Sequence, residues 1–204
     1  MGIFKKREEG PKRGGVRLIG VCGVVPGGGA THTAILLANY LRQKRRRVAL
    51  LEWNGKEDFA KLQRFYEGRS YRDGEGRRFS IGGVDYYKAF TLEDLPAILE
   101  RRYDDILFDK GSRPGGGQDR IFCEVNLLVA HASEWRQEGL LECWEGRQGA
   151  GGLGENWQVL VPLGIEENIR SLQKRVGMPI HRIGCFEDPF TKNKALLEVF
   201  GKVL

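Results

Sequence analysis

One stretch of the sequence limits the possible folds more than any other. The apolar run that begins at Leu18 leads into Pro26-Gly27-Gly28-Gly29-Ala30-Thr31, and apolar residues at helical spacing follow over residues 31–43. A strand, a glycine-rich turn and a helix in direct succession are the layout of a phosphate-binding loop, whose glycines let backbone N–H groups surround phosphate oxygens at a helix N-terminus. Because a second apolar strand follows over residues 47–52, the stretch predicts an α/β protein with a mainly parallel sheet.

The predicted loop lacks the lysine that normally neutralises the outer phosphates. Ala30 stands at that place, whereas Thr31 keeps the hydroxyl that would bind Mg²⁺. His32 could contact phosphate instead, although its ordinary pKa leaves it little charge at neutral pH. The candidate nucleotide-binding residues are Gly27, Gly28, Gly29, Ala30, Thr31 and His32. A tight turn that only lets the helix pack on the sheet is the alternative interpretation of the same glycines.

This loop resembles the deviant Walker A motif K-G-G-x-G-K-[ST] of the MinD/ParA group of P-loop NTPases. Val25 then stands at the signature lysine and Ala30 at the second lysine, so both cations are missing. The resemblance implies an α/β, parallel-sheet P-loop sandwich with helices on both faces over residues 16–204, after a basic flexible tail at residues 1–15. In character the chain is most similar to the TadZ/CpaE pilus-localisation proteins, which implies a degenerate member of the group.

The resemblance also assigns roles to two carboxylates. The second strand ends LLEWN where the group has LLIDxD, so Glu52 and Asn54 stand in for two aspartates. Residues 103–109, YDDILFD, are similar to the group's YDxIIID strand, and Asp109 matches the aspartate that reaches Mg²⁺ through water. If nucleotide binds, Thr31 and Asp109 would serve the metal, and Glu52 and Asp109 would be candidate catalytic groups. The alternative is that each carboxylate lies at the carboxyl edge of the sheet without a catalytic role. In this interpretation Glu52 is solvated.

Further segments are assigned in the same way. Lys110–Gln118 carries four glycines and a proline, which predicts an irregular loop at the carboxyl end of a parallel strand. The resemblance makes this loop a phosphate sensor, and Arg113 is the candidate replacement for the missing lysine. Pro189, in IGCFEDPF, is expected near the nucleotide base. The glycine-rich segment 146–154 has no assigned role.

Charge favours no nucleic-acid site. The net charge is +6, but residues 1–17 contain six basic and two acidic residues, so much of the excess lies in the expected tail. A second basic cluster, residues 42–47, lies at a helix end, where cations complement the helix dipole and solvation is the simpler explanation. Nucleic-acid binding is therefore the less favoured alternative.

Other patterns concern packing and location. An apolar stripe of Trp135, Leu140, Leu141 and Trp144 predicts a packed helix over residues 133–144, and the amphipathic helix 192–203 is expected to pack on the sheet rather than on a membrane. The sequence has no apolar run of about 20 residues. Its four cysteines lack metal-binding spacing, which predicts reduced, mostly buried thiols in a cytoplasmic protein. Weak peripheral recruitment to the inner face of the membrane stays open.

The sequence leaves two functions. The preferred one is a pseudo-NTPase that acts as a non-catalytic localisation or docking platform, with a protein partner or a second copy bound across the P-loop face. Departures at Val25, Ala30 and Asn54 favour it, because loss of a phosphate-neutralising cation reduces phosphoryl transfer by orders of magnitude. The alternative is a switch or weak ATPase that binds ATP and Mg²⁺ through the lysine-less loop.

Overall fold

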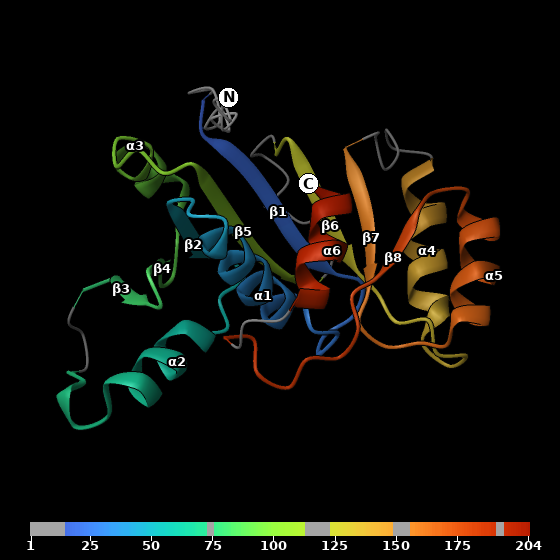
Figure 1. The fold of residues 1–204 in the computed structure, drawn as a ribbon, viewed down its shortest axis with the longest axis horizontal. Coiled ribbons are helices and arrows are strands. Elements are labelled where there is room, and N and C mark those ends of the chain that lie inside the picture. Colours follow the sequence, from blue (N-terminus) through green and yellow to red (C-terminus); the bar gives the residue numbers. More distant parts are fainter. Residues whose placement is uncertain (1–14, 73–75, 113–122, 149–155, 191–193) are drawn as a thin grey trace, which may run out of the picture.

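The computed structural model describes residues 15–72, 76–112, 123–148, 156–190 and 194–204. Within this part of the chain, eight strands form one sheet in the order β3-β4-β2-β5-β1-β6-β7-β8 (Figure 1). The strands are β1 (Arg17–Gly23), β2 (Val48–Glu52), β3 (Arg78–Ile81), β4 (Val84–Tyr87), β5 (Asp105–Ser112), β6 (Val125–Val129), β7 (Trp157–Val161) and β8 (Ile180–Arg182). Neighbouring strands are parallel except for the β3–β4 hairpin.

Helices cover both faces of this sheet, as the sequence predicts. They are α1 (Ala30–Gln43), α2 (Asp58–Glu67), α3 (Leu95–Leu99), α4 (Gln137–Gln148), α5 (Glu166–Val176) and α6 (Lys194–Val203), with 3₁₀ turns at Gly68–Ser70 and Leu92–Asp94. Along β5, Leu107 packs into the cluster under α1 and α6, whereas Ile106 and Phe108 pack into a cluster with Ile98 of α3 on the opposite face. The helices α4 and α5 cover the same opposite face over β6 and β7.

The last helix packs against the protein, so that prediction is confirmed. Leu196, Phe200 and Val203 are buried, and the rings of Tyr40 and Phe200 lie 5.3 Å apart between α1 and α6. Figure 1 shows these two helices side by side in front of the sheet. Among the residues that the structure describes, every helix is too short or too polar to cross a bilayer.

Two predicted boundaries are wrong. Residues 110–112 do not begin a loop but continue β5, because Ser112 pairs with Gly23 of β1 past a register shift that Gly111 accommodates at φ +70°. The fourth helix begins at Gln137 rather than at residue 133, since the amides of Arg136 and Gln137 both bond to the carbonyl of Ser133 in a turn.

The predicted apolar stripe of α4 is correct except for one residue. Leu140 is fully buried, and Leu141 and Trp144 pack beside it. Trp135 precedes the helix and is 78% exposed. A large aromatic surface therefore faces solvent at the end of β6.

The cysteine prediction holds in part. All four cysteines lie in the described residues and none forms a disulfide. Cys22 and Cys123 are buried, Cys143 is half-buried and Cys185 is exposed, so only two of the thiols are enclosed.

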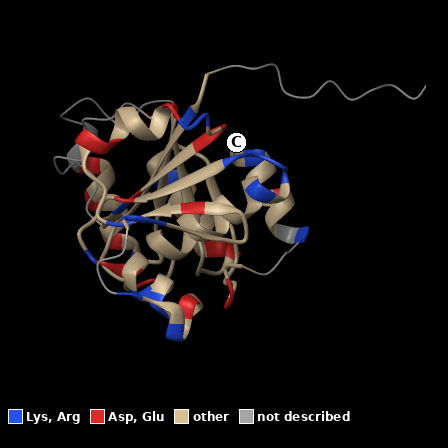
Figure 2. Ribbon diagram, turned by 90° about the vertical axis from the view of Figure 1, so that its left-hand side faces the viewer, with Lys and Arg blue, Asp and Glu red and all other residues tan. Residues whose placement is uncertain are grey.

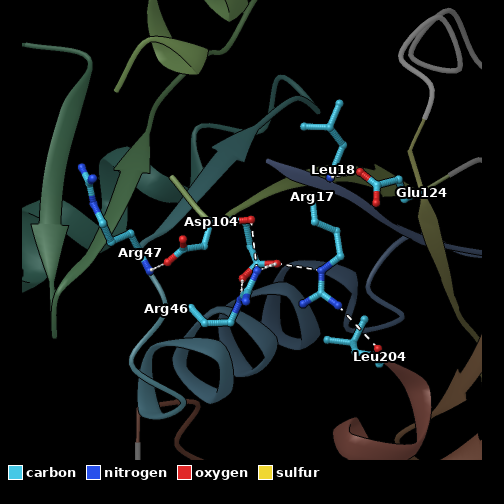
Figure 3. A network of polar contacts seen from close by, with 8 residues as sticks. Arg17, Leu18, Arg46, Arg47, Asp104, Glu124 and Leu204 are labelled. Carbon is cyan, nitrogen blue, oxygen red and sulfur yellow. Dashed lines mark hydrogen bonds and ion pairs between the residues drawn. The ribbon is translucent and has the colours of Figure 1, made fainter. Parts of the chain in front are cut away.

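The basic cluster after α1 is used within the fold. Arg46 and Arg17 both form ion pairs with the buried carboxylate of Asp105, at 2.7 Å for Arg17, where β1 and β5 begin (Figure 3). Arg47 donates to the carbonyl of Arg101 at 2.7 Å and lies over the ring of Tyr103. These arginines hold the amino edge of the sheet, which is the edge opposite the glycine loop.

Candidate functional site

The glycine loop forms a tight turn between β1 and α1. Gly27 and Gly29 have φ angles of +70° and +90°, which favour glycine, and the amide of Gly28 donates to the carbonyl of Val25 at 3.1 Å. A Cβ on Gly28 would lie 2.9 Å from that carbonyl oxygen. No side chain caps the first turn of α1 and no acidic residue lies in it. The N-terminus of α1 is therefore not capped by any side chain, as an anion-binding helix start requires.

Val25, the predicted counterpart of the signature lysine, is half-buried beside the loop. Its methyl groups would lie 3.1 Å from a Cβ on Gly139 of α4 and 3.4 Å from one on Gly28. Because Val25 packs between the loop and α4, its place serves packing in this structure.

Asp109 lies beside the loop and is fully buried. Asn54 Nδ2 donates to its Oδ2 at 2.8 Å, and the amide of Gly111 donates to its Oδ1 at 3.1 Å. Burial raises the pKa of Asp109 to about 6; hydrogen bonds from Thr31 and Gly111 oppose the rise and the nearby Glu52 adds to it. The structure thus brings together Thr31 and Asp109, the two predicted metal residues.

Glu52 is the register partner of Asp109 on the neighbouring strand. Its side chain is 1% exposed, so its interpretation as a solvated carboxylate is wrong. Oε1 accepts from the amide of Phe59 at the start of α2 at 3.1 Å, and Oε2 accepts from the amide of Ala89 at 3.5 Å. Glu52 therefore accepts hydrogen bonds from the backbone of two separate segments, the start of α2 and the residues after β4.

A cavity of about 210 Å³ adjoins the glycine loop. Gly27, Gly28, Gly29, His32 and Thr33 line one side, and residues that follow β6, β7 and β8 line the others. Two buried polar atoms at this cavity, Thr33 Oγ1 and His131 Nε2, have no hydrogen-bond partner in the described part of the chain. Burial lowers the pKa of His131, and Arg136 acts in the same direction, so the ring is neutral at pH 7.

Thr33 and His131 are absent from the site that the sequence predicts. A residue directly after a parallel strand faces the carboxyl edge of the sheet, so the position of His131 after β6 was a usable signal. For Thr33 no signal existed, because a threonine within a helix gives no hint of an unpaired hydroxyl.

Pro189, another predicted site residue, lies beside α1. The carbonyl of Pro189 accepts from Asn39 Nδ2 at 3.2 Å, and Pro189 does not line the cavity, which Ile183 and Phe186 close on that side. Arg113 lies outside the described residues, as do the tail at residues 1–14 and residues 149–154 of the second glycine-rich segment.

The rim of the site carries three large exposed apolar side chains, next to the exposed charged residues Glu134 and Arg136. Trp135, Leu163 and Ile165 are large exposed side chains in the loops after β6 and β7. These two loops are joined by a bond from the Ala132 amide to the Leu163 carbonyl at 3.0 Å. Leu163 also lines the cavity.

The donor set fits a nucleotide only in part. Thr31 and Asp109 suit a phosphate with Mg²⁺, and each oxygen of Asp109 keeps a lone pair beside its bond from Asn54 or Gly111, but the loop offers no lysine to neutralise the phosphate. Within the described residues, no three His, Cys, Asp or Glu side chains are grouped as a metal site. A metal ion here would therefore depend on the oxygens of a bound nucleotide.

No protein-family model matches the sequence, and no curated protein matches it. Solved structures do. A ParA family ATPase from Chlorobium tepidum aligns with a TM-score of 0.60 at 16% identity, over 90% of each chain. The MinC:MinD cell division complex of Aquifex aeolicus aligns with a TM-score of 0.62 at 14% identity, over 84% of this chain and 83% of that one. MinD of Pyrococcus horikoshii, complexed with Mg-ADP, aligns with a TM-score of 0.54 at 19% identity, over 92% of this chain and 94% of that one. This chain has the fold of the MinD/ParA P-loop ATPases.

Proposed function

We propose that the chain is a degenerate MinD/ParA-like protein that acts as a non-catalytic localisation or docking platform in the bacterial cytoplasm. The observation that carries the proposal is the state of Asp109 and Glu52: each oxygen of both carboxylates accepts a hydrogen bond from the chain itself. These bonds give both carboxylates a structural use within the chain, although each oxygen keeps a second lone pair.

The missing cations point in the same direction. Ala30 and Val25 occupy the places of both lysines, and Val25 packs against α4. Removal of one comparable charged group lowers phosphoryl transfer by about 10³-fold or more. Without both lysines, the chain is expected to transfer phosphoryl groups very slowly.

The exposed apolar side chains of the rim support docking. Trp135, Leu163 and Ile165 present exposed apolar surface on the face that carries the glycine loop. Exposed aromatic and aliphatic side chains of this kind form the centre of protein interfaces. A protein partner or a second copy across this face is the occupant that we propose.

The test is calorimetric titration with ATP and ADP, with and without Mg²⁺, on the wild type and on Thr31→Ala and Asp109→Ala. Glu198→Ala, an exposed carboxylate on α6, is the control. We expect no binding up to millimolar nucleotide. Micromolar, Mg²⁺-dependent binding that both site variants lose and the control keeps would overturn the proposal.

One observation favours the alternative, a Mg²⁺-dependent ATP-binding switch. The cavity beside the loop has two unsatisfied polar atoms, Thr33 Oγ1 and His131 Nε2, and buried polar atoms are usually satisfied. If nucleotide binds, Thr33→Val and His131→Phe should weaken it. A hydrolysis assay with Arg113→Gln would then decide whether that arginine replaces the lysine.

A further inference from the structure

A second cavity, of about 230 Å³, lies at the β3 edge of the sheet, between the β3–β4 hairpin and α3. Its floor is apolar, because Tyr87, Phe90 and Ile98 are all buried. Four cationic side chains line it: Arg77, Arg78, Lys88 and Arg101. This cavity shares no residue with the glycine-loop site.

The cations outnumber their partners. Among the lining residues the only carboxylate is Asp94, which pairs with Arg77 at 2.8 Å, while Arg78 pairs with Asp85 at 3.4 Å. Neither Lys88 nor Arg101 pairs with a carboxylate of the described residues. Like charges held around one small cavity repel each other unless an anion lies between them.

The walls are fixed by hydrogen bonds. The Lys88 amide donates to the carbonyl of Arg77 at 2.7 Å, and the Arg77 guanidinium also donates to the carbonyl of Ala89. Ala89 has a φ of +46°, which an alanine adopts only under constraint, and Glu52 accepts from its amide at 3.5 Å. These bonds hold the backbone walls of the cavity in place, while three of its four cations, Arg77, Arg78 and Arg101, are exposed to solvent.

We propose that this cavity binds a small phosphate-bearing anion. Asp94 and Asp85 offset Arg77 and Arg78, so the charges of Lys88 and Arg101 remain, and a phosphate dianion can offset both where a single carboxylate offsets one. Arginine forks also match phosphate geometry. The apolar floor suits an aromatic or aliphatic body attached to the phosphate.

A nucleic acid would require a wider basic surface. Figure 2 shows the side of the molecule that carries the hairpin and α3, and there the basic and acidic residues are interspersed. A discrete phosphate ester, either a free small molecule or a phosphorylated side chain of a partner, matches this arrangement.

The test is titration with phenyl phosphate, with benzoate as the carboxylate counterpart and inorganic phosphate as the probe that lacks the ring. We expect saturable binding, with affinity decreasing from phenyl phosphate to inorganic phosphate to benzoate. Lys88→Gln and Arg101→Gln should each weaken phenyl phosphate about tenfold, because each removes one charged hydrogen bond. A phosphotyrosine peptide that binds more tightly than phenyl phosphate would identify a protein source, and weaker binding a small molecule.

Two variants separate this site from other anion sites. Lys174→Gln removes an exposed charge on α5 and should leave the affinity for phenyl phosphate unchanged, as should Thr31→Ala in the first turn of α1. Arg101→Gln should also raise the thermal midpoint of the ligand-free protein, because it relieves repulsion. Non-saturable binding, equal losses in Lys174→Gln, or binding that only Thr31→Ala abolishes would overturn the proposal.

Discussion

Asn54 holds Asp109 by a hydrogen bond of 2.8 Å from its amide nitrogen to Oδ2, across the carboxyl ends of β2 and β5. The same Asn54 accepts the amide of Lys56 at 2.9 Å through its Oδ1, so its amide group is fixed at both ends. Asn54, one of the two residues that depart from the LLIDxD pattern, is therefore the side-chain donor to the buried Asp109.

Asn54→Asp should destabilise the protein, although it restores the aspartate of the resembled motif. The substitution replaces a donor to Asp109 by a second carboxylate at hydrogen-bond distance, which we expect to cost about 2 kcal/mol near pH 8. The loss should shrink near pH 5, where one of the two acids takes up a proton. Urea unfolding at both pH values measures it. Asn54→Ala, which removes the bond without adding charge, should lose less at pH 8; an equal loss would contradict the argument.

The stability contributed by Asp109 should fall as pH rises. Its pKa is raised to about 6 in the folded protein, whereas an unfolded aspartate titrates near 3.9, so between these values the folded state holds more protons. Over about two pH units this removes roughly 3 kcal/mol, all of it by pH 7. Asp109→Asn should therefore be relatively more stable at pH 7.5 than at pH 4.5. Unfolding free energies of both proteins across that range test this, and a difference that does not change with pH would contradict it.

Glu52→Ala should destabilise both the start of α2 and the segment after β4. It leaves the amides of Phe59 and Ala89 without an acceptor, and we expect a loss of about 2–4 kcal/mol from unsatisfied amides and the new cavity. Hydrogen exchange at Phe59 should accelerate with it. Glu52→Gln keeps an acceptor oxygen and should be milder in both measurements. Exchange that is unchanged in Glu52→Ala would mean that the carboxylate does not hold α2.

The glycine loop and the alternation of strands and helices could be predicted because apolar periodicity and glycine positions are local signals. The burial of Glu52 and Asp109 could not, since it depends on the register of β2 with β5 and on partners such as Ala89, 37 residues away. The strand at residues 110–112 is not predictable for a related reason: its pairing with β1, distant in sequence, overrides the local effect of Gly111 in β5. Trp135 fits the apolar spacing of a helix but precedes α4, because such spacing alone does not locate a helix start.

Asp105→Ala should be among the most damaging single changes at the amino edge of the sheet. It leaves Arg17 and Arg46 without their shared, fully buried carboxylate, and loss of one member of such a buried pair typically costs about 3–5 kcal/mol. Thermal unfolding measures the loss. Arg46→Met, which removes a cation whose side chain is partly exposed, should cost less because Arg17 still pairs with Asp105. The reverse order would contradict this account of the network.

Trp135→Ala should weaken association without weakening the fold. Its side chain is 78% exposed, so its removal should change the free energy of unfolding by no more than about 0.5 kcal/mol. Phe65→Ala is the matched control, because Phe65 is an aromatic residue on α2 that is 80% exposed and lies outside the rim of the glycine-loop site. If the glycine-loop face docks a second copy, sedimentation velocity over a range of concentrations should show self-association that Trp135→Ala reduces and Phe65→Ala leaves unchanged. Equal reduction by both variants would place the contact elsewhere. A wild type that stays monomeric at every concentration would leave docking of a different protein as the role of this face, with Trp135 as its expected anchor.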